Sequence, residues 1–126
     1  YATLRTSDMS LSSSSDARHA YVLDGVRYCH LIDPRTGWPM NRPDASGVQQ
    51  GVATATILGS CAAYDDAMTT ALCVMGEEAA AAYIAAHPES QAVVVAYQSD
   101  RSELTVHTNL PPEALTVLDT AYQLAR

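Results

Sequence analysis

Residues 51–76 read GVATATILGSCAAYDDAMTTALCVMG and contain two patterns in succession. The first nine residues, GVATATILG, alternate β-branched residues with small ones, which is typical of a strand that ends at Gly59. Ser60 fits the N-cap of a helix that runs to about Met75, with Gly76 as its C-terminal stop. The sequence therefore predicts a strand that leads directly into a helix.

The preceding residues indicate small antiparallel strands. MSLSSSS, residues 9–15, begins with the apolar-polar alternation of a half-buried strand, and HAYVLDGVRYCHLI, residues 19–32, contains two extended runs joined by Asp24 and Gly25, a strong hairpin signal. DPRTGWPMNRPDASG, residues 33–47, cannot hold regular structure because its prolines remove backbone donors. We expect a loop there, and Trp38 favours an ordered one.

The residues after the helix complete the prediction of fold class. EEAAAAYIAAHPES indicates a second helix that ends before Pro88, and QAVVVAYQ and ELTVHTN indicate a hairpin that turns around Ser99 to Ser102. PPEALTVLDTAYQLA predicts a closing helix with Pro112 near its first turn. Strict β-α-β alternation is absent, so we expect an α+β fold of antiparallel hairpins and a mixed sheet, with the helices packed on one side.

Composition limits the classes of function. The chain has 126 residues, 48% of them apolar, which fits a single domain over residues 1–126. Seven basic and fourteen acidic residues give a net charge of −7, and the basic residues are scattered, so we expect no nucleic-acid partner. The longest apolar run is far shorter than a transmembrane segment. The chain lacks an initiator methionine and starts in a β-like pattern, so we expect it to be a piece of a longer protein.

The helix over 60–75 carries two adjacent carboxylates. Its other residues form apolar faces around most of the circumference, so we expect it to be buried on most sides. Buried carboxylates are costly unless something compensates them, and the helix has no Lys or Arg. The compensation for Asp65 and Asp66 must come from outside the helix. The residues that form the two apolar faces are Tyr64, Met68, Leu72 and Met75, and Ala63, Ala67, Ala71 and Val74.

Asp66 and Thr70 are spaced i and i+4, so their oxygens can converge on one point, whereas Asp65 points elsewhere. A carboxylate and a hydroxyl are hard oxygen ligands, which suit Mg²⁺ or Ca²⁺ better than zinc. In the alternative interpretation, Asp66 accepts hydrogen bonds from neighbouring backbone amides and Thr70 bonds the carbonyl of its own preceding turn. The spacing leaves both interpretations open.

His30 lies in the apolar half of YCHLIDPRTGWPM, residues 28–40. In a strand, His30 and Cys29 face opposite ways, so they cannot form a thiol–imidazole pair. A lone strand histidine is either structural or catalytic. The adjoining turn, Asp33-Pro34-Arg35-Thr36-Gly37, combines backbone amides, a hydroxyl and a guanidinium, which together can hold a phosphate, although an ordinary Pro-Gly turn has the same residues.

YCHLIDPRTGWPM, followed by a strand and then DDAMTTALCVMG, resembles the ApbE-type FAD:protein FMN transferases, whose pattern is H-[IL]-I-D-P-R-T-G-x-P and then D-A-x-x-T-A-L. MSLSSSS is similar to a serine-rich strand that precedes this block in the family. The resemblance covers roughly residues 9–108. Family members are longer than this chain, and the part missing here is expected to supply much of the flavin pocket and a backbone metal ligand.

The resemblance implies Mg²⁺-dependent transfer of FMN from FAD to a threonine hydroxyl of an acceptor protein, with release of AMP. Asp66 and Thr70 would be the metal-binding pair. His30 would be the catalytic histidine, acting as a base or as a phosphate orienter, and with the turn from Asp33 to Gly37 it would lie near the FAD pyrophosphate.

Two other classes of function stay open. In the first class, the chain is a non-catalytic flavin or nucleotide binder, or a half-domain that needs an N-terminal half or a second chain. In the second class, it is a structural module that binds no flavin. The resemblance implies a periplasmic or membrane-anchored lipoprotein, yet no lipid-attachment cysteine lies near the start of the chain, and a cytoplasmic location is the alternative.

Overall fold

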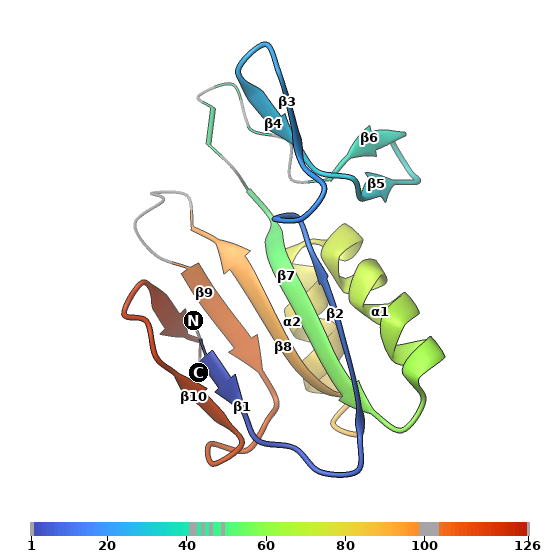
Figure 1. Cartoon of the computed structure of the whole chain (residues 1–126), viewed down its shortest axis with the longest axis vertical. Coiled ribbons are helices and arrows are strands. Elements are labelled where there is room, and N and C mark those ends of the chain that lie inside the picture. The colour runs from blue at the N-terminus through green and yellow to red at the C-terminus, as the bar shows by residue number, and fades with distance from the viewer. Residues whose placement is uncertain are drawn as a thin grey trace.

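The computed structural model describes residues 2–40, 43, 45, 47–48, 50–98 and 104–125. Its centre is a five-stranded sheet in the order β11-β9-β8-β7-β2, and both helices cover one face of this sheet (Figure 1). The α+β class and the placement of the helices on one side are confirmed. The strands are β2 (Ser10–Ser15), β7 (Val52–Gly59), β8 (Gln91–Tyr97), β9 (Leu104–Thr108) and β11 (Tyr122–Leu124), and the helices are α1 (Ala62–Met75) and α2 (Glu77–Ala86).

The two faces of the sheet bury separate apolar clusters because side chains alternate along each strand. On β7, Ala55 and Ile57 pack toward the helices, and Leu58 packs toward the opposite face. That opposite face is covered by β1 (Ala2–Leu4) and β10 (Leu115–Val117), which pair with each other antiparallel. The predicted strands over 9–15, 51–59 and 91–98 are confirmed, and β8 and β9 pair antiparallel as expected.

The predicted hairpin is also confirmed, as β3 (Tyr21–Leu23) and β4 (Val26–Tyr28). Asp24 and Gly25 both have positive φ, 51° and 78°, as a type I′ turn requires. The hairpin projects beyond the end of the sheet (Figure 1). An ion pair of 3.5 Å between Arg27 and the buried carboxylate of Asp16 ties it to the sheet.

The expectations that the second extended run continues to residue 32 and that residues 33–47 hold no regular structure are wrong. β4 ends at Tyr28, and a separate short pair follows, β5 (Ile32–Asp33) and β6 (Trp38–Pro39). Cys29 is buried and its thiol donates to the Met40 carbonyl at 3.1 Å, which ties the link between β4 and β5 to the end of β6. Part of the expected loop over 33–47 and the predicted turn from Ser99 to Ser102 lie outside the described residues.

α1 differs from the prediction in its start and in its burial. Its N-cap is Cys61 rather than Ser60, and no side chain caps it. It is not buried on most sides: Tyr64 is 50% exposed and Met75 38%. An alanine-rich helix forms without needing burial all round, because alanine favours the helix by itself. The buried line is Asp65, Thr69, Leu72 and Cys73.

The predicted closing helix is wrong, because residues 115–117 and 122–124 form β10 and β11. The Ala114 amide donates to the Pro111 carbonyl at 2.9 Å, which makes a turn instead of a helix start. Asp119 accepts the Ala121 amide at 3.0 Å in a second turn. Partner strands for both segments are available in β1 and β9, so tertiary pairing overrides the helical pattern.

Candidate functional site

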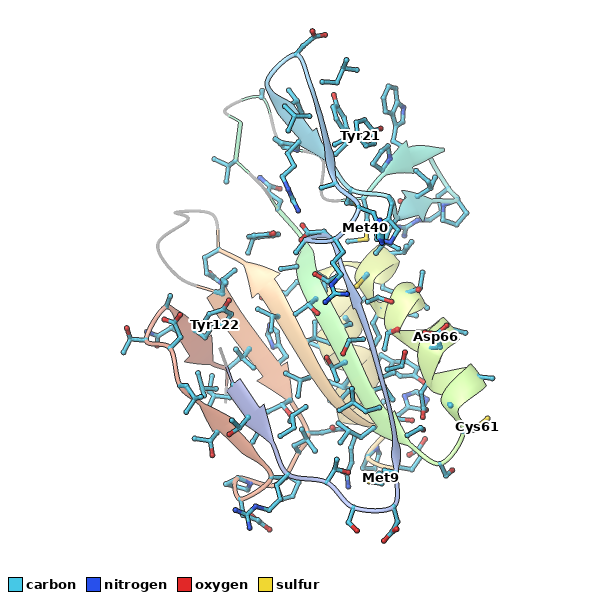
Figure 2. The ribbon with its side chains drawn as sticks, viewed as in Figure 1. Met9, Tyr21, Met40, Cys61, Asp66 and Tyr122 are labelled. Atoms are coloured by element: carbon cyan, nitrogen blue, oxygen red, sulfur yellow. The ribbon has the colours of Figure 1, made fainter. Side chains whose placement is uncertain are left out.

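Alternate serines of β2 face α1 and contact its polar residues. Ser12 donates to Oδ1 of Asp66 at 2.7 Å, and the hydroxyls of Ser14 and Thr70 lie 3.1 Å apart. Two strand residues advance about 6.6 Å and four helix residues about 6 Å, so serines two apart meet helix residues four apart. This match of repeats places Asp66, which is labelled in Figure 2, and Thr70 next to β2.

The two adjacent aspartates have different environments. Asp65 is buried, accepts a hydrogen bond from Ser10 and lies against Gly59, where an added Cβ would come within 2.8 Å of the Asp65 carboxyl carbon. Asp66 is exposed, and its Oδ2 has no hydrogen-bond partner among the described residues. The compensation expected from outside the helix comes from serine hydroxyls. Among the residues that the structure describes, no backbone amide donates to Asp66, contrary to the alternative interpretation, and its second oxygen is open to a ligand.

The turn from Asp33 to Gly37 satisfies most of its own donors. The Arg35 amide donates to Oδ1 of Asp33 at 2.9 Å, and the Gly37 amide donates to the Asp33 carbonyl at 2.8 Å. Gly37 has φ +73°, a conformation that favours glycine. The Thr36 amide also donates to the Asp33 carbonyl, at 3.2 Å, and the Trp38 amide donates to Oγ1 of Thr36, also at 3.2 Å. A phosphate here would therefore meet side-chain groups rather than free amides.

Arg35 connects this turn to the C-terminal end of α1. Its guanidinium pairs with the Asp33 carboxylate at 2.9 Å and donates to the Val74 carbonyl at 2.9 Å. The hydrogen bonds from Arg35 lower the pKa of Asp33, and the hydrogen bonds to Asp33 raise the pKa of Arg35. The Asp33–Arg35 pair thus stays ionised and holds the turn against the helix.

A groove of about 540 Å³ runs between the turn and the exposed side of α1. It brings Pro34 and Arg35 to the same surface as Thr70, which lies 35 positions or more after them in the sequence. Most of its wall is apolar, and Arg35 and Thr70 supply polar groups. The full wall consists of Ile32, Pro34, Arg35, Ala67, Thr70, Ala71, Val74 and Met75.

His30 is exposed and does not form part of this wall. Its ring meets the His19 ring edge to face, with the centroids 5.5 Å apart. Because β4 ends before it, His30 lies in an irregular segment rather than on the strand face predicted for it. The structure thus brings Thr70 together with Pro34 and Arg35 at the groove. Asp66 lies beside β2, and His30 contacts His19.

The donor set fits a hard cation that keeps part of its shell for other ligands. No three His, Cys, Asp or Glu side chains gather into a metal-binding group within the described residues. Asp66 and Thr70 offer one carboxylate and one hydroxyl, both exposed. Mg²⁺ is commonly bound through one or two protein oxygens, with waters and substrate phosphate completing its shell. The pair therefore suits Mg²⁺ with a phosphate ligand.

Ser12 and Ser14 are site residues that the helix spacing alone did not identify. The signal for them was present in MSLSSSS, because alternate residues of a strand face one way. The sequence does not show which element packs against that face. It takes the packing of α1 on β2 to show that these hydroxyls meet Asp66 and Thr70.

Comparison with known proteins gives matches in both sequence and structure. The model of the ApbE family matches residues 1–95. The FAD:protein FMN transferase of Vibrio cholerae is 39% identical over 71 residues, which are 56% of this chain and 19% of that protein. The solved structure of the Vibrio cholerae flavin transferase ApbE superposes with a TM-score of 0.58 at 31% identity, over 78% of this chain and 27% of the other. The Pseudomonas stutzeri flavinyl transferase ApbE, in its apo form, gives a TM-score of 0.58 at 26% identity, over 80% and 29%.

The chain thus spans only about a fifth of the Vibrio cholerae relative that it matches. Among the described residues, neither helix has the length and apolar character needed to span a lipid bilayer.

Proposed function

Because the chain belongs to the ApbE family, we propose that it takes part in Mg²⁺-dependent transfer of FMN from FAD to a threonine hydroxyl of an acceptor protein, with release of AMP. The observation that carries this proposal is the position of Asp66 and Thr70, which are exposed one helical turn apart, with Thr70 lining a groove that also contains Arg35. Hydroxyl, carboxylate and guanidinium groups there suit a diphosphate together with a divalent cation.

The reaction forms one bond and breaks one bond. The threonine oxygen of the acceptor bonds to the phosphorus of the FMN phosphate, and the bond from that phosphorus to the oxygen bridging to AMP breaks. The hydroxyl proton passes from the threonine to a base, and AMP departs with the bridging oxygen. The reacting phosphorus is surrounded by negative charge, so the site must neutralise charge and align the two oxygens.

Each residue has a distinct part in this proposal. Asp66 and Thr70 would hold the cation, which when bound would neutralise diphosphate charge. Arg35 offers Nη1, which has no partner among the described residues, to a further phosphate oxygen. Asp33, Thr36 and Gly37 keep the turn in shape through their internal hydrogen bonds. His30 takes the threonine proton or orients the phosphate.

A second candidate function follows from the length of the chain. It spans 19% of the Vibrio cholerae transferase that it matches, so the remaining part of a flavin pocket would come from another segment or another chain. On this proposal the chain binds FAD or its diphosphate and contributes the metal pair, and transfer needs the missing part.

One experiment separates the two candidates. The chain is incubated with FAD, Mg²⁺ and a threonine-bearing acceptor, the products are separated by denaturing electrophoresis, and flavin fluorescence is read from the acceptor band. Labelling that disappears with EDTA supports the transferase. FAD binding without labelling supports the half-domain, and absence of both flavin binding and labelling contradicts both candidates.

A further inference from the structure

We infer that Ser12 and Ser14 of β2 are positioning residues for the metal pair. Their hydroxyl groups fix the directions of the hydrogen bonds, so that one oxygen of Asp66 and the oxygen of Thr70 stay open to the cation. This inference rests on the proposed function. It concerns Ser12 and Ser14, which come from a strand more than 50 positions before the helix residues that they contact.

The first part concerns the carboxylate. Ser12 donates its one proton to Oδ1 of Asp66 at 2.7 Å. That bond holds the carboxylate in one orientation and uses one of its oxygens, while Oδ2 has no partner among the described residues. An exposed aspartate without such a bond would sample several rotamers, and ordering it would cost free energy when the cation binds. Ser12 removes part of that cost in advance.

The direction of the Thr70 hydroxyl follows from the single proton that each hydroxyl in its hydrogen-bond chain can donate. Thr69 donates its proton to the Asp66 backbone carbonyl at 2.8 Å. Thr69 must therefore accept in its contact with Ser14, at 2.9 Å, so the Ser14 proton is used there. Ser14 must in turn accept from Thr70, 3.1 Å away.

This chain of single protons gives Thr70 a defined polarity. Its proton points back to β2, and none of its lone pairs is used by Ser14. Thr70 is exposed and lines the groove, so its oxygen can accept a cation on that side. Thr69 controls this direction although it is fully buried and cannot itself contact a ligand.

The test measures Mn²⁺ affinity, with Mn²⁺ replacing Mg²⁺, by the loss of the free-ion electron paramagnetic resonance signal in the presence of FAD. Outer partners of metal ligands typically contribute roughly 10- to 100-fold in affinity. We expect Ser12→Ala to weaken Mn²⁺ binding within that range and Ser12→Thr, which keeps the hydroxyl, to restore most of it. The matched control is Ser13→Ala, which loses a hydroxyl contact of 2.7 Å to Thr56 on the other face of the same strand.

The proton order has its own variant. Thr69→Val keeps the shape of a buried side chain and removes both its proton and its acceptor oxygen. Ser14 then donates to Thr70, whose proton turns toward the groove, and we expect Mn²⁺ binding to weaken roughly tenfold, within the same range. Thr69→Ser keeps the order and should retain affinity. In a Thr70→Ala background, Ser14→Ala should cause no further loss.

The outcomes distinguish the inference from the proposed function. Wild-type binding that depends on Asp66, with Ser12→Ala and Thr69→Val both equal to Ser13→Ala, would overturn the inference and leave the metal site standing. Absence of Mn²⁺ binding by the wild-type chain would overturn both. Urea unfolding of each variant accompanies the affinity measurement, and a loss of affinity in Ser12→Ala with an unfolding midpoint equal to that of Ser13→Ala supports positioning.

Discussion

Ser12 and Asp66 are 54 positions apart in the sequence and are joined by a hydrogen bond of 2.7 Å. This bond connects an edge strand of the sheet to the helix that runs alongside it, and the second oxygen of the carboxylate has no hydrogen-bond partner among the described residues. The same strand holds Thr70 through Ser14. The candidate metal pair is therefore supported by β2 as well as by the spacing of residues on α1.

Replacing Asp66 tests the metal role. Asp66→Ala should abolish Mg²⁺-dependent flavin transfer or, if the chain binds without transferring, Mg²⁺-dependent FAD binding. The fold should stay intact because Asp66 is exposed. Circular dichroism and a Mg²⁺ titration check both parts, with Glu78→Gln, an exposed carboxylate of α2, as the matched control. Retained function at an unchanged Mg²⁺ requirement would refute the assignment.

The role of His30 is tested by His30→Asn. We expect loss of turnover with FAD still bound, because the imidazole acts on the proton or the phosphate rather than on the flavin. The matched control is His19→Asn, since His19 contacts the His30 ring and has φ 54°, a conformation that asparagine tolerates. Equal rates for His30→Asn and the wild-type chain would exclude a catalytic role.

Gly59 is predicted to be indispensable for the packing of Asp65. A Cβ at this position would lie 2.8 Å from the Asp65 carboxyl carbon, so Gly59→Ala should lower the free energy of unfolding by roughly 1–3 kcal/mol. Urea denaturation measures the loss. In an Asp65→Ala background the added methyl has room, so the effect of Gly59→Ala should largely disappear. Equal losses in both backgrounds would show that the contact is not the cause.

Alkaline pH should destabilise the protein through Cys73. Burial raises the pKa of its thiol from 9.0 to about 12, so the unfolded chain releases this proton first as the pH rises. The free energy of unfolding should therefore fall above pH 9, by roughly 3 kcal/mol at pH 11 from this group. Burial raises the pKa of Tyr97 as well, which acts in the same direction at higher pH.

The measurement is urea unfolding at pH 8 and pH 11. Cys73→Ala should show a smaller fall between the two pH values than the wild-type chain, and Cys61→Ser, at an exposed cysteine, should show the full fall. An identical fall in Cys73→Ala would contradict the assignment.

Local patterns predicted the parts of the fold whose cause is local. The turn at Asp24 and Gly25 follows from backbone preferences, and the strand over 51–59 follows from its alternation. The C-terminal segment was mispredicted because Leu115–Val117 and Tyr122–Leu124 take their structure from partner strands distant in sequence. A helical pattern in the sequence holds no information about such partners.

The candidate site shows the same division. Helix geometry predicted that Asp66 and Thr70 lie on the same side of α1, and both contact β2, but their exposure could not be predicted because the helix looked apolar on most sides. Which of the two aspartates is buried, Asp65 or Asp66, depends on where β2 packs against the helix. The groove between Arg35 and Thr70 likewise depends on the bond from Arg35 to the end of α1.

The proposed binding of a divalent cation by Asp66 and Thr70, against the diphosphate of FAD, can be tested in crystals. The most direct measurement is anomalous diffraction from crystals of the chain grown with Mn²⁺ and FAD. On this proposal, a manganese peak should lie within bonding distance of Oδ2 of Asp66 and Oγ1 of Thr70, with a phosphate oxygen as a further ligand. A peak and a diphosphate located away from both residues, in crystals where the groove is open to solvent, would contradict it.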